Sequence, residues 1–476
     1  MRVRTGQSPR VVAVALCAAT IAGALLRLWN LSFESLWIDE IWSGYLVSGS
    51  PIDVIGRLIT EDNHPPLYHL LQWPFPRIFT VDAGLRLPSA IFGILAIPLI
   101  FAVGRRLFDE HVGLLSAVFL ALSPFAVHAG RDARYYSLLL FLSLLAILAF
   151  LRLRQRQDRS SAVLLGLALA LVLYTQYMGG LFVAALLLTA FFMGGEVRRG
   201  AVWAGIVAFA LFLPWLLAAR AGFGNVMGNY WILPPTAKTV AVALGSLAVL
   251  GRFPWSWPVA PAVLISLCWL IAVVLGARGA RDRGPARFCV LLLVLPVLAE
   301  LAISTVRPLF LTRTLIPIVP PLLLLAAKGA LSLPRPKLAA ILLAATLLPG
   351  SLALHLVHHN ENWRGAIGYL AARIEPGEVI VVDPFHSRAV AHYGRNVRAV
   401  RQAPVVLLPP HSTVDDVPGL IRDRLGLEPR SFWLVIRTCD REDTDTRDRA
   451  MRTLRVTADF EENAAAALRF IDPAKR

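Results

Sequence analysis

Long apolar runs recur along this chain and constrain its fold more than any other feature of the sequence. An α-helix needs about 20 mainly apolar residues to cross the roughly 30 Å hydrocarbon core of a bilayer. The runs, several of them short, lie at 11–29, 87–107, 113–129, 135–151, 161–177, 180–194, 201–219, 259–276, 288–305, 314–331 and 338–355. The sequence therefore predicts an all-α polytopic membrane protein with about eleven transmembrane helices.

The overall composition agrees with a membrane protein and excludes nucleic-acid binding. Of the 476 residues, 57% are hydrophobic and 16% are charged, whereas soluble proteins have about 45–50% and about 25%. The net charge of +16 is divided among short basic clusters between apolar runs, so it forms no single patch for a nucleic acid. The cysteines form no CxxC pair and indicate neither a disulfide framework nor a zinc site: Cys17, Cys268, Cys289 and Cys439.

The basic clusters predict how the chain is oriented. Every second connection between runs is densely basic, and such loops face the cytoplasm. These connections contain Arg2, Arg4 and Arg10; Arg105 and Arg106; Arg152 to Arg159; Arg198 and Arg199; Arg278 to Arg287; and Lys328, Arg335 and Lys337. The pattern predicts a cytoplasmic membrane protein with the N-terminus inside and the C-terminus outside.

Two segments test this interpretation. The run Val240–Leu250 is too short to cross and would break the alternation of basic loops, so we interpret it as an interfacial or re-entrant helix. The basic N-terminus followed by an apolar run is also the pattern of a signal peptide. We favour a first transmembrane helix, because the orientation of the later runs depends on it.

The sequence predicts a transmembrane domain over 1–355 and two soluble parts on the outer side. The first soluble part is an outer loop of this domain at 30–86, which is rich in Trp, Pro and His. Residues 356–476 form the second part, an extracytoplasmic domain. The stretches EPGEVIVVDP and SFWLVIRT within it are typical of buried strands, so we expect a small α/β domain.

The outer loop contains two adjacent carboxylates in the stretch SLWIDEIWSGYLVSG. The apolar and aromatic residues around Asp39 and Glu40 suit a helix at the membrane interface. A carboxylate there could act as a general base towards a hydroxyl group. The alternative is an exposed acidic pair in a loop.

Further along the same loop, EDNHPPLYHLLQWPF places His64 directly before two prolines. Proline is tolerated in the first turn of a helix, so His64 is expected at a helix start, where free N–H groups can hold an anion. A solvated histidine in a turn is the alternative.

A basic cluster follows the third apolar run in HAGRDARYYSL. Arg131 and Arg134 flank Asp132 where lipid phosphates lie, and arginine offers a planar fork for phosphate oxygens. The alternative is an interfacial cluster of snorkelling side chains. We favour phosphate binding, because outer basic clusters are few in this sequence.

Four other charged residues lie at membrane level. Arg86, Arg307 and Arg313 are further basic residues on the predicted outer side. Glu300 lies inside an apolar run, which marks a functional residue by default. It is equally interpreted as a structural partner of an arginine such as Arg307. The sequence lacks a phosphate-binding glycine loop, so nucleotide-dependent function is not supported.

Together these stretches resemble the GT-C superfamily of membrane glycosyltransferases, in the branch with protein O-mannosyltransferases and the lipid A aminoarabinose transferase (bacterial glycosyltransferase family 39-like). The resemblance spans nearly the whole chain. It rests on WIDE (37–40), HPPLY (64–68), RLPSAIFGILAIPLIFAVGRRLF (86–108), LSPFAVHAGRDARYYSL (122–138), YTQYMGG (174–180), TRTLIPIVPPLLLLAAKG (312–329) and NWRGAIGYL (362–370).

The resemblance implies a role for each matching residue. Asp39 is the expected catalytic base with Glu40 as its neighbour, and Asp132 is the expected second acidic residue. The donor phosphate is expected at the basic residues and the tyrosine of the matching motifs: His64, Arg86, Arg134, Tyr135 and Arg313. Relatives often have histidine where this sequence has Gln176, so a possible divalent metal stays open and no other cofactor is expected.

The resemblance implies sugar transfer, with inversion, from a polyprenyl-phosphate donor to an acceptor hydroxyl on the outer face of the membrane. Partners would be membrane lipids, the donor and a glycan, lipid or protein acceptor. The alternatives are a flippase for lipid-linked saccharide, or a receptor or scaffold. A flippase explains the arginines and Glu300 equally well, but it explains the large outer loop and the outer C-terminal domain less well. A receptor or scaffold would give Asp39 and Asp132 no function.

Overall fold

The computed structural model divides the chain into two compact units. It describes residues 8–62, 64–220, 222, 232–247, 259–278, 283–357, 360–408, 417–426, 431–438 and 455–471. The first unit contains Met1–Leu31 and Leu46–Val357, and the second contains Ser32–Tyr45 and His358–Arg476. Residues 32–45, part of the predicted outer loop, therefore group with the C-terminal tail.

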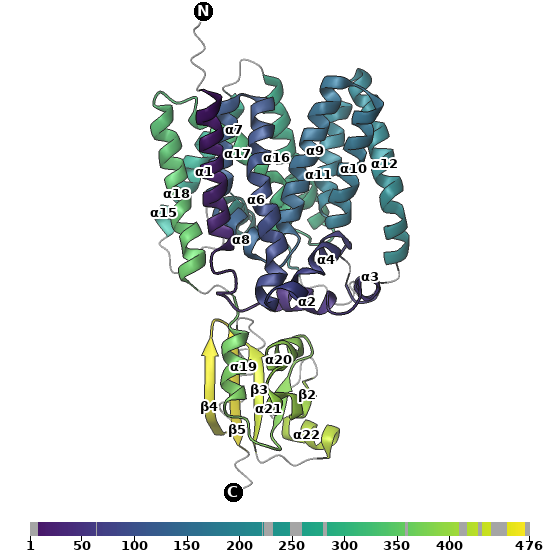
Figure 1. Cartoon of the computed structure of the whole chain (residues 1–476), viewed down its shortest axis with the longest axis vertical. Coiled ribbons are helices and arrows are strands. Elements are labelled where there is room, and N and C mark those ends of the chain that lie inside the picture. The colour runs from purple at the N-terminus through teal and green to yellow at the C-terminus, as the bar shows by residue number, and fades with distance from the viewer. Residues whose placement is uncertain are drawn as a thin grey trace, which may run out of the picture. The chain divides into compact units, whose positions relative to one another are not determined.

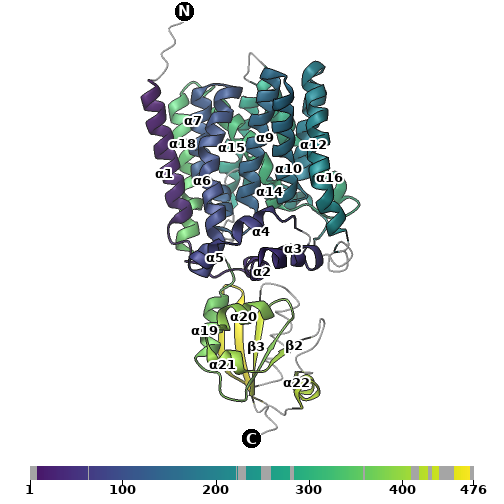
Figure 2. The same cartoon turned by 45° about the vertical axis from the view of Figure 1, so that its right-hand side comes forward.

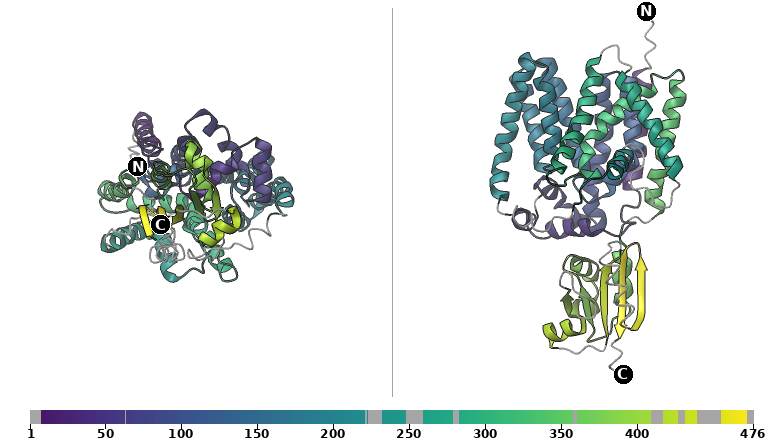
Figure 3. Two further views of the ribbon diagram at one scale, coloured as in Figure 1. Left: turned by 90° about the horizontal axis from the view of Figure 1, so that it is seen from below. Right: turned by 180° about the vertical axis from the view of Figure 1, so that it is seen from behind.

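The first unit is a bundle of long helices that run alongside one another (Figures 1, 2 and 3). Its helices are α1 (Pro9–Leu28), α3 (Pro51–Thr60), α4 (Leu67–Gln72), α5 (Phe75–Ile78), α6 (Val81–Leu107), α7 (Glu110–Leu122), α8 (Pro124–Arg131), α9 (Tyr136–Arg156), α10 (Arg159–Thr175), α11 (Gly179–Phe191), α12 (Gly195–Ala219), α14 (Ala237–Gly245), α15 (Val259–Arg278), α16 (Arg283–Ser304), η2 (Thr312–Ile318), α17 (Val319–Ala330) and α18 (Pro336–Leu356).

Each of the eleven predicted runs is helical. Eight helices in the described residues are long and apolar enough to span a membrane, and α7 with α8 makes a ninth if this pair, bent by 56°, is one span. The other two runs are α10 and α11, with 17 and 13 residues, which are short for a bilayer. The polytopic helical fold is confirmed, and eleven crossings stay a prediction.

The bend between α7 and α8 has a local cause. Pro124 occupies the first turn of α8 and supplies no N–H group for a continuing helix. The hydroxyl of Ser123 instead accepts a hydrogen bond from the backbone N–H of Ala126 (3.3 Å) and caps the new helix. Helix α8 ends at Arg131, the first residue of the motif RDAR.

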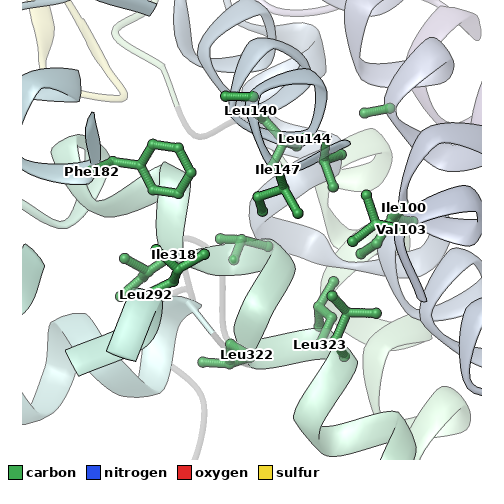
Figure 4. Close-up of a cluster of buried hydrophobic side chains, with 14 of the residues drawn as sticks. Ile100, Val103, Leu140, Leu144, Ile147, Phe182, Leu292, Ile318, Leu322 and Leu323 are labelled. Atoms are coloured by element: carbon green, nitrogen blue, oxygen red, sulfur yellow. The ribbon is translucent and has the colours of Figure 1, made fainter. Parts of the chain in front are cut away.

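The bundle has a tightly packed interior and an apolar outer surface. Figure 4 shows part of the interior, where side chains of α6, α9, α11, α16, η2 and α17 meet: Ile100, Val103, Leu140, Leu144, Ile147, Phe182, Leu292, Ile318, Leu322 and Leu323. In contrast, Val14, Trp203, Leu264 and Ile341 on outer helices are each more than 60% exposed. An apolar surface of this kind suits contact with lipid.

Helices α15 and α17 approach closely because of two glycines. A Cβ atom at Gly276 would lie 2.0 Å from the carbonyl oxygen of Leu325, and one at Gly329 would lie 1.8 Å from that of Ala272. Small residues at such crossings let helix backbones pack against each other where lipid provides no hydrophobic drive.

The predicted short helix at Val240–Leu250 is only partly described. Helix α14 begins at Ala237, earlier than predicted, because Thr236 caps it through the backbone N–H of Thr239 (3.1 Å). Residues 248–250 lie outside the described residues. The interfacial position of this helix stays a prediction.

The second unit contains a five-stranded mixed sheet in the order β2-β1-β3-β5-β4. The strands are β1 (Val379–Val382), β2 (Val405–Leu407), β3 (Ser431–Arg437), β4 (Arg455–Glu462) and β5 (Ala465–Ile471). β1 is parallel to β2 and β3, and β5 is antiparallel to β3 and β4. β1 and β3 are the two strands that the sequence predicted.

The helices of this unit are α2 (Ile38–Leu46, whose last residue belongs to the first unit), α19 (Trp363–Ala371), α20 (Ser387–Gly394), α21 (Arg398–Gln402) and α22 (Val417–Leu425). α19 packs against β4 and β5, and α22 packs against β2. The predicted small α/β domain is confirmed.

Candidate functional site

A cluster of charged and aromatic side chains lies in the first unit, where the loop before α4 meets the start of α9. The Nε2 atom of His64 lies 3.5 Å from Nη2 of Arg134 and 3.3 Å from the hydroxyl of Tyr135. Arg134 also lies over the Tyr135 ring, 5.3 Å from its centroid. Two stretches predicted separately to bind phosphate therefore meet in space.

Asp62 sets the orientation and charge of His64. One carboxylate oxygen of Asp62 contacts Nδ1 of His64 (2.5 Å) and accepts the His64 backbone N–H (2.9 Å). Burial lowers the pKa of His64, but the charge of Asp62, the charge of Tyr135 and the hydrogen bond to Asp62 together outweigh burial, so the net shift is upward. Burial raises the pKa of Asp62. The charge of His64, the hydrogen bond to His64 and the charge of Arg134 together lower this pKa by more, so the net shift is downward. The geometry thus favours an ion pair that leaves Nε2 directed at Arg134 and Tyr135.

A second histidine in the same segment has the opposite character. His69 in α4 is buried, and burial lowers its pKa to about 3. His69 is therefore neutral at physiological pH, whereas His64 is biased towards its charged form.

Two further residues from distant parts of the sequence reach this cluster. The hydroxyl of Tyr135 interacts with the charge of Arg313 and forms a hydrogen bond with Gln176. The side-chain oxygen of Gln176 also accepts the backbone N–H groups of Met178 and Gly179, which caps α11. We call Asp62, His64, Arg134, Tyr135, Gln176 and Arg313 the basic cluster.

The backbone beneath Arg134 is fixed by a buried chain of hydrogen bonds. The hydroxyl of Ser89 in α6 donates to the carbonyl oxygen of Arg134 (2.9 Å) and contacts the hydroxyl of Tyr68 (2.8 Å). Gln72 donates to the carbonyl oxygens of Leu85 (2.7 Å) and Ala133 (3.5 Å). α4 and α6 therefore hold the loop that presents Arg134.

Glu300, in the same unit, contacts the start of η2. This buried carboxylate accepts the hydroxyl of Thr314 (2.5 Å) and the backbone N–H of Leu311 (3.2 Å). Both contacts lie at the start of η2, next to Arg313. These contacts favour the structural interpretation of Glu300, with Thr314 and Leu311 as partners.

The motif RDAR divides into residues with different contacts. Arg131 is partly exposed and donates to the carbonyl oxygens of Trp29 (2.7 Å) and Asn30 (3.1 Å), just after α1 ends. Asp132 is buried at the end of α8, and its carbonyl oxygen accepts the backbone N–H of Arg134 (2.7 Å). Of the two arginines, Arg134 is the one in the basic cluster.

Arg86 has a contact at the end of α1. Its buried side chain donates to the carbonyl oxygen of Leu31 (3.0 Å). This contact fixes the chain where it leaves α1, so any part of Arg86 in phosphate binding stays a prediction.

The two predicted acidic residues of the outer loop lie in the first turn of α2, in the second unit. Asp39 is partly exposed, and Glu40 is buried. The carboxylate of Glu40 accepts the backbone N–H of Trp37 (3.2 Å), so it closes the start of the helix on which Asp39 lies. Asp39 is the more accessible of the two carboxylates.

The structure adds residues that the sequence analysis did not single out. Asp62 is one, although an Asp two residues before His64 in a Pro-rich turn is a known pattern for a side chain that binds the backbone. Arg27 of α1 is another. It is fully buried and donates to the carbonyl oxygens of Leu120 (3.0 Å) and Ala121 (3.1 Å) near the end of α7. In the sequence Arg27 is a single arginine near the end of an apolar run, and nothing there predicts its contact with α7.

No metal site is apparent in the described part of the chain. Among those residues, no group of three or more His, Cys, Asp and Glu side chains is placed to hold a metal ion.

Known proteins are similar to this chain in one segment of its sequence and in its fold. Residues 63–217, which include most of the basic cluster, match the family described as dolichyl-phosphate-mannose-protein mannosyltransferase. Crystal structures of ArnT from Cupriavidus metallidurans superpose with TM-scores of 0.65 in the apo state and 0.64 with undecaprenyl phosphate bound. Each is 13% identical and covers 97% of this chain and 98% of that one.

The chain has the GT-C fold. AglB, the oligosaccharyltransferase of Archaeoglobus fulgidus, is also similar, with a TM-score of 0.58 and 12% identity over 98% of this chain and 75% of its own. No curated protein matches the sequence. The resemblance to the GT-C superfamily inferred from the motifs is thereby confirmed, and its fold extends through the second unit.

Proposed function

We propose that this GT-C protein transfers a sugar from a polyprenyl-phosphate donor to an acceptor hydroxyl. The basic cluster is the observation that carries the proposal. It combines two arginines with a histidine whose pKa is raised. Cationic hydrogen-bond donors of this kind bind phosphate oxygens strongly. In the similar ArnT structure, undecaprenyl phosphate is the bound molecule.

In this proposal the basic cluster binds the donor phosphate. The guanidinium groups of Arg134 and Arg313 and the imidazolium of His64 bind its oxygens, and the Tyr135 hydroxyl adds a donor. As the bond between the anomeric carbon and the phosphate oxygen breaks, the phosphate takes the electron pair and gains charge. Fixed cationic donors stabilise that growing charge and lower the barrier.

The acidic residues act on the acceptor in this proposal. Asp39 accepts the proton of the acceptor hydroxyl, whose oxygen bonds to the anomeric carbon from the face opposite the phosphate. The configuration therefore inverts and no covalent enzyme intermediate forms. Glu40 supports the helix of Asp39, and Asp132 helps to organise the donor and acceptor.

The same proposal places the protein in a cytoplasmic membrane with the second unit outside. The alternation of basic connections supports this orientation, because Arg105 and Arg106 and the other basic clusters lie on loops that would face the cytoplasm. A lipid-linked donor would then be used on the outer face.

An experiment with reconstituted protein distinguishes sugar transfer from movement of the lipid-linked donor across the bilayer. Vesicles containing wild-type protein or Asp39→Asn are given a panel of polyprenyl-phosphate sugars, with a membrane extract as the acceptor source. We expect wild type to release free carrier phosphate from one donor and Asp39→Asn to release little while binding that donor normally. Movement of intact donor across the bilayer without release would instead establish a flippase.

A further inference from the structure

The acidic segment Ser32–Tyr45 belongs structurally to the C-terminal tail. It leaves the first unit after Leu31 and returns to it at Leu46, yet it clusters with His358–Arg476. It contains the first turn of α2, with Asp39. The contacts that hold it come from tail residues more than 300 positions away in the sequence.

Side chains of the tail bind the backbone of this segment before α2. The guanidinium group of Arg364 donates to the carbonyl oxygens of Ser32 (3.1 Å) and Glu34 (3.2 Å). The amide of Asn360 donates to the carbonyl oxygen of Ser35 (3.1 Å). These bonds do not depend on the side chains of the acidic segment, so they fix the path of its backbone.

Two residues of α20 hold the segment further along. The Tyr393 hydroxyl accepts the backbone N–H of Leu36 (2.7 Å). Arg388 lies over the rings of Trp42 (4.1 Å) and Tyr45 (4.5 Å), which stand on α2 itself. Cation–π contacts of this kind favour one orientation of the helix.

Glu361 contacts the helix start directly. Its buried carboxylate accepts the backbone N–H of Ile38 (3.0 Å) and the indole N–H of Trp363 (3.2 Å), and it pairs with Arg437 of β3 (2.9 Å). The first N–H groups of a helix lack partners within the helix, so an acceptor from outside fixes its start. Ile38 immediately precedes Asp39.

We propose that Glu361 is a positioning residue for Asp39, and that the tail domain thereby forms part of the catalytic machinery. The inference rests on the proposed function, in which Asp39 is the base. Without Glu361, the N–H of Ile38 and the charge of Arg437 lose their buried partner. The start of α2 then moves, and a base displaced by about 1 Å loses much of its effect.

The tail offers a closely matched control in Glu378. This buried carboxylate also accepts a backbone N–H (Glu375, 2.9 Å) and an indole N–H (Trp433, 2.9 Å), and it pairs with an arginine (Arg469, 2.8 Å). All of these partners lie within the tail. A change at Glu378 therefore removes the same kinds of contact and leaves those of the acidic segment in place.

The test compares Glu361→Ala, Glu361→Gln and Glu378→Ala in the full-length protein. We expect Glu361→Ala to lower kcat at least about tenfold, with the Kd of the donor within about twofold of wild type. Glu361→Gln keeps an acceptor for Ile38 and should recover part of kcat. Glu378→Ala should lower Tm about as much as Glu361→Ala but leave kcat near the wild-type value.

Hydrogen exchange of the Ile38 amide gives a second readout that needs no turnover. The inference predicts faster exchange in Glu361→Ala than in Glu378→Ala. Equal exchange, or equal kcat losses in the two alanine variants, overturns the inference, because the effect is then one of general stability. If wild type itself consumes no donor, the proposed function fails, and with it the catalytic part of the inference.

Discussion

The cationic side chains of the basic cluster and Tyr135, which we propose bind the donor phosphate, come from three separate segments of the sequence. His64 comes from the loop before α4, Arg134 and Tyr135 from the start of α9, and Arg313 from η2. Each arginine or histidine alone is an ordinary interfacial residue. In the proposed function, it is their meeting that makes a specific site for the phosphate.

Arg134→Met tests the cationic part of this cluster. A hydrogen bond to a charged group contributes about 1.5–3 kcal/mol, so we expect donor binding to weaken roughly 10- to 100-fold. The measurement is the Kd of the donor in detergent or lipid. Arg131→Met is the matched control from the same motif, because Arg131 contacts the end of α1. Equal losses in both variants would show that general positive charge is what matters.

Asp62→Asn tests the charge of His64 through its pH dependence. Burial lowers the pKa of His64, but the charge and hydrogen bond of Asp62 and the charge of Tyr135 together raise it above its usual 6.5. His64 also faces Arg134 and His69. In the proposed function the cationic form of His64 binds phosphate, so donor affinity is expected to be highest below this pKa and to fall as pH rises through it. In Asp62→Asn that fall should move to lower pH. An unmoved profile would mean that another group titrates.

The sequence predicted these residues better than their arrangement. His64, Arg134 and Arg313 stand in motifs that mark them, but nothing in a single sequence states which motifs meet. Asp62 was missed because its effect depends on the turn that brings its oxygen to Nδ1 of His64. Arg131 and Arg134 differ by only three positions, and only the structure separates their contacts.

At the scale of elements, the apolar runs located the helices, because a membrane requires every backbone N–H and C=O group of a span to be bonded within its own helix. The runs could not show the 56° bend at Ser123, which depends on one proline and one cap. Nor could they show that 32–45 packs with the tail, since strand and helix patterns carry no information about distant partners.

Glu300 connects one element to the site. It holds the start of η2 through Thr314 and Leu311, beside Arg313. We expect Glu300→Ala to weaken donor binding about as much as Arg313→Ala does, because η2 loses its anchor. Glu300→Gln keeps an acceptor for both partners and should bind nearly as wild type. The Kd values of the three variants check this, and a severe loss in Glu300→Gln would indicate that the charge itself is used.

The whole molecule combines a helical GT-C bundle with a mixed sheet, and the chain passes between the two units at 31/32, 45/46 and 357/358. The acidic segment Ser32–Tyr45 therefore belongs to the unit with the sheet. This division suggests that the tail and the acidic segment function together, which a boundary at residue 355 alone would not indicate.

The orientation of the whole molecule is testable by cysteine labelling in intact cells. Ser332→Cys lies in an exposed connection predicted to face the cytoplasm, and Ala372→Cys lies at an exposed end of α19. In a background without the four native cysteines, a membrane-impermeant maleimide should label Ala372→Cys and spare Ser332→Cys. The reverse pattern would contradict the predicted topology.

One measurement tests the central claim most directly: the fate of the donor's bond between sugar and phosphate in a single turnover. Wild-type protein is mixed with the donor it consumes and its acceptor, and the released carrier phosphate and the product are quantified together. The account predicts equal amounts of both, and a sugar linked with the opposite anomeric configuration to the donor. Retained configuration, or sugar transfer without release of carrier phosphate, would contradict it.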